Sequence, residues 1–142
     1  MQTATGSVEM RAALLSVLLI AGCTDFSESV GAAAPTGTVW ELETINDRAA
    51  EGRLTLTFLA SGRVRGQLPC NSYAARQTAP LPWFELQNFE SGDTRCEASA
   101  LETHYLDLLG SMDLAEPAGE ALLLTNPEGD TLFFRARPPA TA

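Results

Sequence analysis

The sequence predicts a domain of antiparallel β-hairpins that carries a single helix, and three stretches support this. Residues 54–68 alternate in side-chain polarity around a Ser61-Gly62 turn, which is the pattern of a half-buried hairpin. Residues 120–137 repeat that pattern around a turn at residues 126–130. Between the hairpins, residues 98–112 place apolar side chains on one face at helical spacing.

The N-terminus indicates an exported chain with a lipid anchor. Residues 12–22 are almost all apolar, too short for a membrane-spanning helix, and of the length of a signal-peptide core. Leu19-Ile20-Ala21-Gly22 before Cys23 resembles the lipobox of bacterial lipoproteins. Cleavage there leaves Cys23 as the first residue, and more than one acyl chain on it makes anchoring stable. The alternative is an ordinary signal peptide with a chance cysteine.

The chain divides into four parts. Residues 1–22 are interpreted as the signal peptide, and translation starts at either Met1 or Met10. Residues 23–37 form a lipidated, flexible tether, residues 38–137 one domain, and residues 138–142 a tail. Thr24, in place of Asp, favours sorting to the outer membrane by resemblance to Gram-negative lipoproteins. The expected location is therefore the periplasmic side of the outer membrane.

The net charge of −9 excludes some partners. Nucleic-acid binding requires clustered cations, so no nucleic-acid partner is expected. The same excess of negative charge argues against weak binding of the protein surface to anionic lipids, apart from the anchoring by acyl chains on Cys23. An envelope protein is the expected partner, and the sequence does not define the oligomeric state.

Period-two alternation marks the strands. Trp40 and Leu42 share one face of the first strand. Pro69 ends the third strand, because proline has no donor for a ladder, and Pro117 favours a loop over residues 114–119. The predicted strands are residues 39–45, 54–60, 63–68, 74–77, 83–89, 120–126 and 131–137.

The predicted helix begins at a capping box. Ser99 and Glu102 have the spacing at which hydroxyl and carboxylate satisfy each other's backbone amides. The helix ends at Gly110 or Ser111. Its apolar stripe consists of Ala98, Leu101, Tyr105, Leu108, Leu109 and Met112.

Cys70 and Cys96 remain once Cys23 is lipidated, and an even pair in an exported domain is most simply a disulfide. The bond would close 96 − 70 = 26 residues, worth roughly 3.5 kcal/mol by chain entropy. It would join the end of the first hairpin to the start of the helix, with Cα atoms about 5.5–6 Å apart. The alternative is a cysteine nucleophile with His104 as its base.

No other pattern points to catalysis, a metal or a cofactor. His104 is the sole histidine, and no spacing of potential ligands resembles a metal site. The chain also lacks a phosphate-binding loop and a nucleophile elbow. Two pairs of arginines share strand faces, and adjacent hairpins would bring all four onto one surface; the alternative is solvated arginines paired with acids. They are Arg63, Arg65, Arg135 and Arg137.

The order of these features resembles the META domain family, the heat-shock HslJ-like lipoproteins, from Trp40 to about Phe134. The most specific part is the Cys70-Asn71-Ser72-Tyr73 step followed by Thr94-Arg95-Cys96 before the helix. Further matching positions are Trp40, Gly66 and Glu102.

The resemblance implies an α+β fold in which a strongly curved antiparallel sheet, close to an incomplete barrel, wraps around one main helix. It also implies no catalytic residues and a loose link to envelope stress. The fold looks similar to that of pilotin lipoproteins, which escort partners in the envelope, although fold alone does not define function.

We therefore expect a non-enzymatic envelope lipoprotein that acts as a structural or stress-related binding module. The alternative is a carrier of a small apolar ligand or acyl chain in a cavity between sheet and helix. Six aromatic side chains motivate the alternative: Trp40, Phe58, Trp83, Phe84, Phe133 and Phe134.

Overall fold

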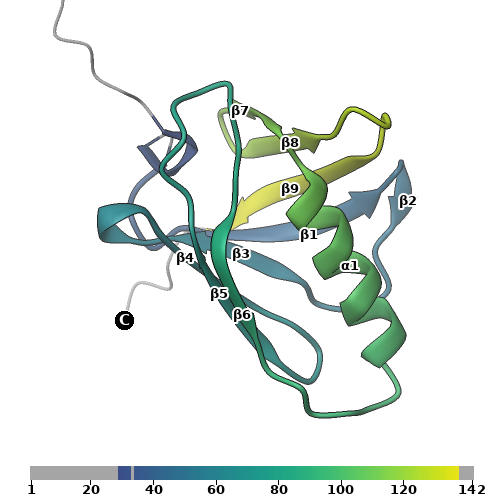
Figure 1. The fold of residues 1–142 in the computed structure, drawn as a ribbon. Coiled ribbons are helices and arrows are strands. Elements are labelled where there is room, and N and C mark those ends of the chain that lie inside the picture. The colour runs from purple at the N-terminus through teal and green to yellow at the C-terminus, as the bar shows by residue number, and fades with distance from the viewer. Residues whose placement is uncertain (1–28, 33, 138–142) are drawn as a thin grey trace, which may run out of the picture.

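The computed structural model describes residues 29–32 and 34–137, which form one antiparallel sheet and one α-helix (Figure 1). The sheet has nine strands in the order β6-β5-β4-β3-β1-β9-β8-β7, and β2 pairs with β1. The strands are β1 (Val39–Ile45), β2 (Arg48–Ala49), β3 (Thr55–Phe58), β4 (Arg63–Gln67), β5 (Ser72–Arg76), β6 (Gln87–Ser91), β7 (Leu114–Ala118), β8 (Ala121–Thr125) and β9 (Thr131–Arg137). The helices are the 3-10 turns η1 (Val30–Ala32) and η2 (Ala60–Gly62) and the α-helix α1 (Ser99–Ser111).

The sheet curls until its two ends meet at one place. Trp83, which precedes β6, forms a bridge with Leu114 at the start of β7. Beside that bridge, the Phe84 amide donates to the Asp113 carbonyl at 2.8 Å and the Ala115 amide donates to the Pro82 carbonyl at 2.7 Å. The predicted fold class, α+β with a strongly curved sheet around one main helix, is confirmed.

Both predicted hairpins are present. In β4, Val64 is buried while Arg63 and Arg65 point to solvent, as the alternation predicts. The hairpin of β8 and β9 sends four side chains into the core, all fully buried: Leu122, Leu124, Leu132 and Phe134. β3 departs from simple alternation, because Thr55 and Thr57 are buried together with Leu56 and Phe58.

Large aromatic and aliphatic side chains fill the space between the sheet and α1. Trp40, Phe84, Tyr105 and Phe134 are at most 2% exposed. Burial of a large apolar side chain contributes roughly 1.5–3 kcal/mol, so this cluster is the main source of stability. From the predicted stripe, Leu109 is also fully buried, whereas Leu101 and Leu108 pack against the core only partly.

Two predictions about the middle of the chain are wrong. Residues 114–118 form β7 although Pro117 favoured a loop, because an edge strand has one side without ladder partners and tolerates proline there. The strand predicted from residue 83 begins only at Gln87, since the backbone of Trp83 and Phe84 bonds to residues around the end of α1 instead.

The packed part of the chain begins before the expected boundary at Thr38. Val30 is fully buried in the core, and Ser29 forms a bridge with Pro80. Part of the stretch interpreted as a flexible tether therefore belongs to the domain. Cys23, the predicted signal peptide and the predicted tail lie outside the described residues. Among the residues that are described, no helix has the length and apolar character needed to cross a membrane.

The predicted surface of four arginines does not form. β3 and β1 lie between β4 and β9, which separates the two arginine pairs. Arg135 Nε lies 2.7 Å from Glu43 Oε1, and Arg137 Nε lies 3.6 Å from Glu41 Oε2. The two arginines of β9 are thus paired with acids of β1, as the alternative expected.

Candidate functional site

Cys70 and Cys96 form the predicted disulfide, with their Cα atoms 6.5 Å apart. This separation slightly exceeds the expected one and lies within the range of disulfides. The bond ties the segment that follows β4 to the segment that precedes α1. Because both sulfurs are bonded to each other, neither is a thiolate that His104 can activate.

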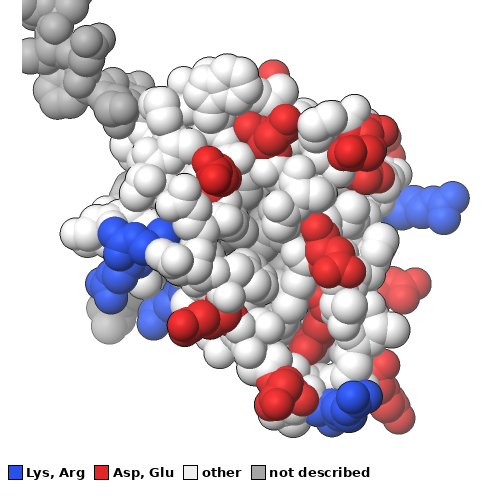
Figure 2. Space-filling model, in the orientation of Figure 1, with Lys and Arg blue, Asp and Glu red and all other residues white. Residues whose placement is uncertain are grey.

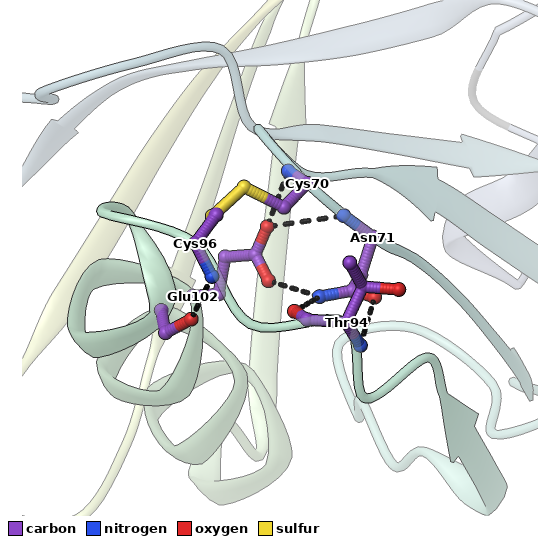
Figure 3. Close-up of a disulfide and its surroundings, with 6 residues drawn as sticks. Cys70, Asn71, Thr94, Cys96 and Glu102 are labelled. Atoms are coloured by element: carbon purple, nitrogen blue, oxygen red, sulfur yellow. Dashed lines mark hydrogen bonds between the residues drawn. A yellow bond between two sulfur atoms is a disulfide. The ribbon is translucent and has the colours of Figure 1, made fainter.

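Glu102 of α1 reaches back to the corner that contains Cys70 (Figure 3). Its side chain is buried, and its Oε1 accepts the Cys70 amide at 2.5 Å and the Asn71 amide at 3.1 Å. Its Oε2 accepts Asn71 Nδ2 at 2.7 Å. Hydrogen bonds to a charged acceptor are stronger than neutral ones, so this carboxylate fixes the corner against the helix.

Asn71 extends the same network to Thr94. Asn71 Nδ2 also donates to the Thr94 carbonyl at 2.8 Å, and the Thr94 amide donates to Asn71 Oδ1 at 3.0 Å. We call Cys70, Asn71, Thr94, Cys96 and Glu102 the clasp. The clasp unites most of the specific motif of the family resemblance in one structural junction.

The predicted capping box is wrong, and the clasp explains why. Ser99 is the first residue of α1, and its hydroxyl accepts the Cys96 amide at 2.8 Å. The N-cap is Ala98, which makes no side-chain hydrogen bond. The Glu102 carboxylate is engaged by three donors at Cys70 and Asn71, more than the single amide a capping box offers it.

Tyr73 and Gly66 form a second structural unit beside the clasp. The Tyr73 hydroxyl lies 2.5 Å from the Thr55 carbonyl, to which it donates, and 2.9 Å from the Tyr105 hydroxyl. Because the Tyr73 hydrogen goes to the carbonyl, Tyr105 must donate to Tyr73. A Cβ at Gly66 would overlap the Thr55 carbonyl and the Tyr73 ring, so only glycine fits there.

Burial raises the pKa of both tyrosines. For Tyr73 the proximity of Tyr105 raises the pKa further. Elsewhere, hydrogen bonds from Asn126 and then Asn46 lower the pKa of Asp130. The hydrogen bond to Glu43 raises the pKa of Arg135.

The clasp is not suited to hold a metal. Within the part of the chain that the structure describes, Cys70, Cys96 and Glu102 bring potential ligand atoms within 4.8 Å of one another. The disulfide removes both thiolates that would bind a metal, and both carboxylate oxygens already accept hydrogen bonds. The arrangement therefore serves stability.

A second feature is a surface groove of about 460 Å³ between β6 and α1. Phe89 of β6 is 39% exposed beside it, and Trp83, earlier in the same segment, is 57% exposed. Figure 2 shows this face as an uncharged hollow with carboxylates around it. The residues that line the groove are Leu86, Phe89, Ser91, Thr103, Leu106, Asp107 and Gly110.

Sequence reasoning did not identify the groove. Residues 83–89 are predicted as a strand with imperfect alternation, whereas Trp83, Leu86 and Phe89 recur every third residue. A segment whose large apolar residues recur every third position, off the period of a strand, is the signal that points to such a surface.

The sequence profile of the META domain matches residues 33–139, so the chain belongs to the META domain family. No curated protein matches the chain. Among solved structures, the chain is similar to a protein from Burkholderia xenovorans, with a TM-score of 0.60, 22% identity, and coverage of 72% of this chain and 83% of that one. It is also similar to a DUF4847 family protein from Bacteroides vulgatus, with a TM-score of 0.51, 16% identity, and coverage of 61% of each chain. At these identities the likeness concerns the fold alone.

Proposed function

We propose that this META domain chain is a non-enzymatic lipoprotein, anchored by acyl chains on Cys23 to the periplasmic side of the outer membrane, that binds another envelope protein. The groove between β6 and α1 is the observation that carries the proposal. Phe89 lines the groove and is 39% exposed. An exposed aromatic residue in a groove is typical of a surface that contacts a partner.

The charges around the groove define the chemistry of the partner. Asp107 of α1 lines the groove, and Figure 2 shows further carboxylates around it. A segment that inserts an apolar side chain between Phe89 and Leu106 and presents arginine or lysine at its rim would complement the groove in shape and charge. The proposed partner is therefore a protein with an apolar, basic segment.

The use of the motif residues supports a non-enzymatic role. Glu102 and Asn71 are engaged in the clasp, and Tyr73 in the tyrosine pair. Catalytic groups must instead face a site that a substrate can reach. The most distinctive polar side chains of the chain are thus committed to holding the domain together.

The alternative of an apolar-ligand carrier has less support. Four of the six aromatic side chains that motivated it are buried in the core: Trp40, Phe58, Phe84 and Phe134. The larger hollows found over the described residues are open depressions on the surface, lined by polar as well as apolar groups. Native mass spectrometry that finds a lipid bound to the domain would revive this alternative.

The proposed lipid anchor on Cys23 is tested by metabolic labelling with a clickable fatty acid. We expect labelling of the wild type and its loss in Cys23→Ala. Unchanged labelling in that variant would rule out the proposed anchor.

Partner binding is tested by crosslinking in intact cells. A photoreactive residue at Phe89 should capture a discrete envelope protein, and Asp107→Asn, which removes the carboxylate that lines the groove, should weaken that capture. A photoreactive residue at Phe133, a partly exposed aromatic position on β9, is the matched control. Equal capture from Phe89 and Phe133 would contradict the groove as the binding surface.

A further inference from the structure

Three arginines lie together on the outer face of β4 and β5. In the register of these strands Arg63 lies directly opposite Arg76, and Arg65 lies opposite Ala74. All three arginines are exposed, whereas the alternate residues of both strands are buried against the core. We call Arg63, Arg65 and Arg76 the arginine face.

The arginine face lacks the compensation that the two arginines of β9 have. Within the described part of the chain, the salt bridges are those of Arg135 and Arg137 with acids of β1. Glu90 shares a shallow hollow of about 310 Å³ with the face and forms no salt bridge with it.

Like charges opposite each other on a sheet are destabilising, and Arg63 and Arg76 are in this arrangement. Arg76 Nη2 donates to the Ser61 carbonyl at 3.0 Å, which leaves its charge unneutralised. In a chain with 18 acidic and 9 basic residues, an unpaired cluster of three arginines is therefore suited to an anion from outside.

Arg63 and Arg76 lie at the end of the β4–β5 pair that leads to the bridge between Pro80 and Ser29. η2 precedes Arg63, and the Gly62 carbonyl accepts the Gln77 amide at 2.8 Å, next to Arg76. Three residues beyond Gln77, Pro80 forms the bridge with Ser29. η1 and η2 lie on the same side of the molecule in Figure 1, and basic side chains gather on that side in Figure 2.

The length of chain before Ser29 keeps this end near the anchor. Cys23 precedes Ser29 by 29 − 23 = 6 residues, which span at most about 20 Å when fully extended. A lipid on Cys23 would therefore hold the arginine face within reach of the membrane surface.

We infer that the arginine face binds the phosphate groups of anionic phospholipids in the membrane to which Cys23 is anchored. The inference rests on the proposed lipid anchor. Three arginines do not recruit a domain of net charge −9 from solution, but the short tether gives them a high effective concentration at the surface. Because α1 packs on the opposite face of the sheet, this orientation leaves the groove open to a partner.

A footprint of arginine reactivity tests the inference. With Cys70 and Cys96 bonded, the mature chain can be coupled through Cys23 to a maleimide lipid in vesicles. The vesicles contain phosphatidylcholine alone or phosphatidylcholine with phosphatidylglycerol. A dicarbonyl reagent then modifies accessible arginines, and peptide mass spectrometry measures the rate of modification of each one. On the anionic vesicles we expect several-fold slower modification of the arginine face, lost at high salt. Arg48, Arg53 and Arg95, exposed elsewhere, should be unaffected.

Two triple variants of equal charge change sharpen the test. Energy transfer from tryptophan to a dansyl lipid should be higher on anionic than on neutral vesicles for the wild type. R63Q/R65Q/R76Q should lose this difference, and R48Q/R53Q/R95Q should keep it.

Equal footprints on both membranes, or the same behaviour of the two variants, would overturn the inference. Because the protein is coupled to the vesicle chemically, the vesicle experiment tests the lipid contact without depending on acylation of Cys23 in cells. Absent fatty-acid labelling in cells removes the anchor, whereas an absent footprint with labelling intact removes only the lipid contact.

Discussion

The clasp and the groove share α1 and differ in how their side chains are satisfied. Glu102 is buried and accepts three hydrogen bonds. One turn further along the helix, Leu106 and Asp107 line an open groove beside the exposed Phe89. The helix is thus held to the sheet on one side and available to a partner on another.

This difference separates the residues that stabilise the domain from the surface proposed to bind a partner. Most of the residues that carry the family resemblance lie in the clasp, the tyrosine pair and the core. The surface proposed to bind a partner contains none of those motif residues. Changes in the clasp should therefore alter the free energy of unfolding, and changes in the groove should alter binding alone.

Removal of the disulfide is expected to have the largest effect. Cys70→Ala with Cys96→Ala should lower the free energy of unfolding by about 2–5 kcal/mol, because the unfolded chain gains the freedom of a 26-residue loop. Urea denaturation measures the change, and reduction of the wild type should reproduce it. A change below about 0.5 kcal/mol would mean that the rest of the clasp suffices.

Gly66→Ala is expected to come next. The new Cβ would overlap the Thr55 carbonyl and the Tyr73 ring, and overpacking of this kind costs about 1–3 kcal/mol. Gly110→Ala is the matched control, because its Cβ would meet open space and alanine favours the helix. If both variants are equally stable, Gly66 is not needed for the approach of Tyr73.

The tyrosine pair predicts a loss of stability at alkaline pH. The folded pKa of Tyr73 and Tyr105 is raised above the ordinary value of 10.0. The stabilising contribution is therefore complete below pH 10 and declines above it, where the unfolded chain releases protons that the folded chain retains. The chain has two tyrosines, and both are buried. Spectrophotometric titration should show no tyrosinate near pH 10 before unfolding; a normal titration would contradict the pair.

The exposed side chain of Trp83 predicts the smallest change in stability. Trp83→Ala should alter the free energy of unfolding by at most about 0.5 kcal/mol, since the side chain is 57% exposed. Thermal and urea unfolding measure this change. A decrease of more than about 2 kcal/mol in the free energy of unfolding would mean that Trp83 packs in the core and is not an exposed surface residue.

The sequence predicted the parts of the fold that depend on local pattern. The alternation of β4 and the apolar stripe around Tyr105 follow from backbone geometry. The disulfide follows from the count of cysteines in a chain that was expected to be exported. The family resemblance supplied the curvature of the sheet around the helix.

The parts that were missed depend on contacts distant in sequence. The role of Glu102 is decided by Cys70 and Asn71, more than 30 residues away, and not by the nearby Ser99. Pro117 is tolerated because β7 is an edge strand, and strand order is not visible in a local pattern. The groove could not be predicted either, since it exists only where β6 and α1 come together.

The most direct test of the clasp is a double-mutant cycle between Glu102 and Asn71. Urea unfolding of the wild type, Glu102→Gln, Asn71→Ala and the double variant gives the interaction free energy. Because the two side chains share a hydrogen bond and the same corner, we expect a coupling of about 1–3 kcal/mol. Losses that add within about 0.3–0.5 kcal/mol would contradict the account, since Glu102 and Asn71 would then act independently.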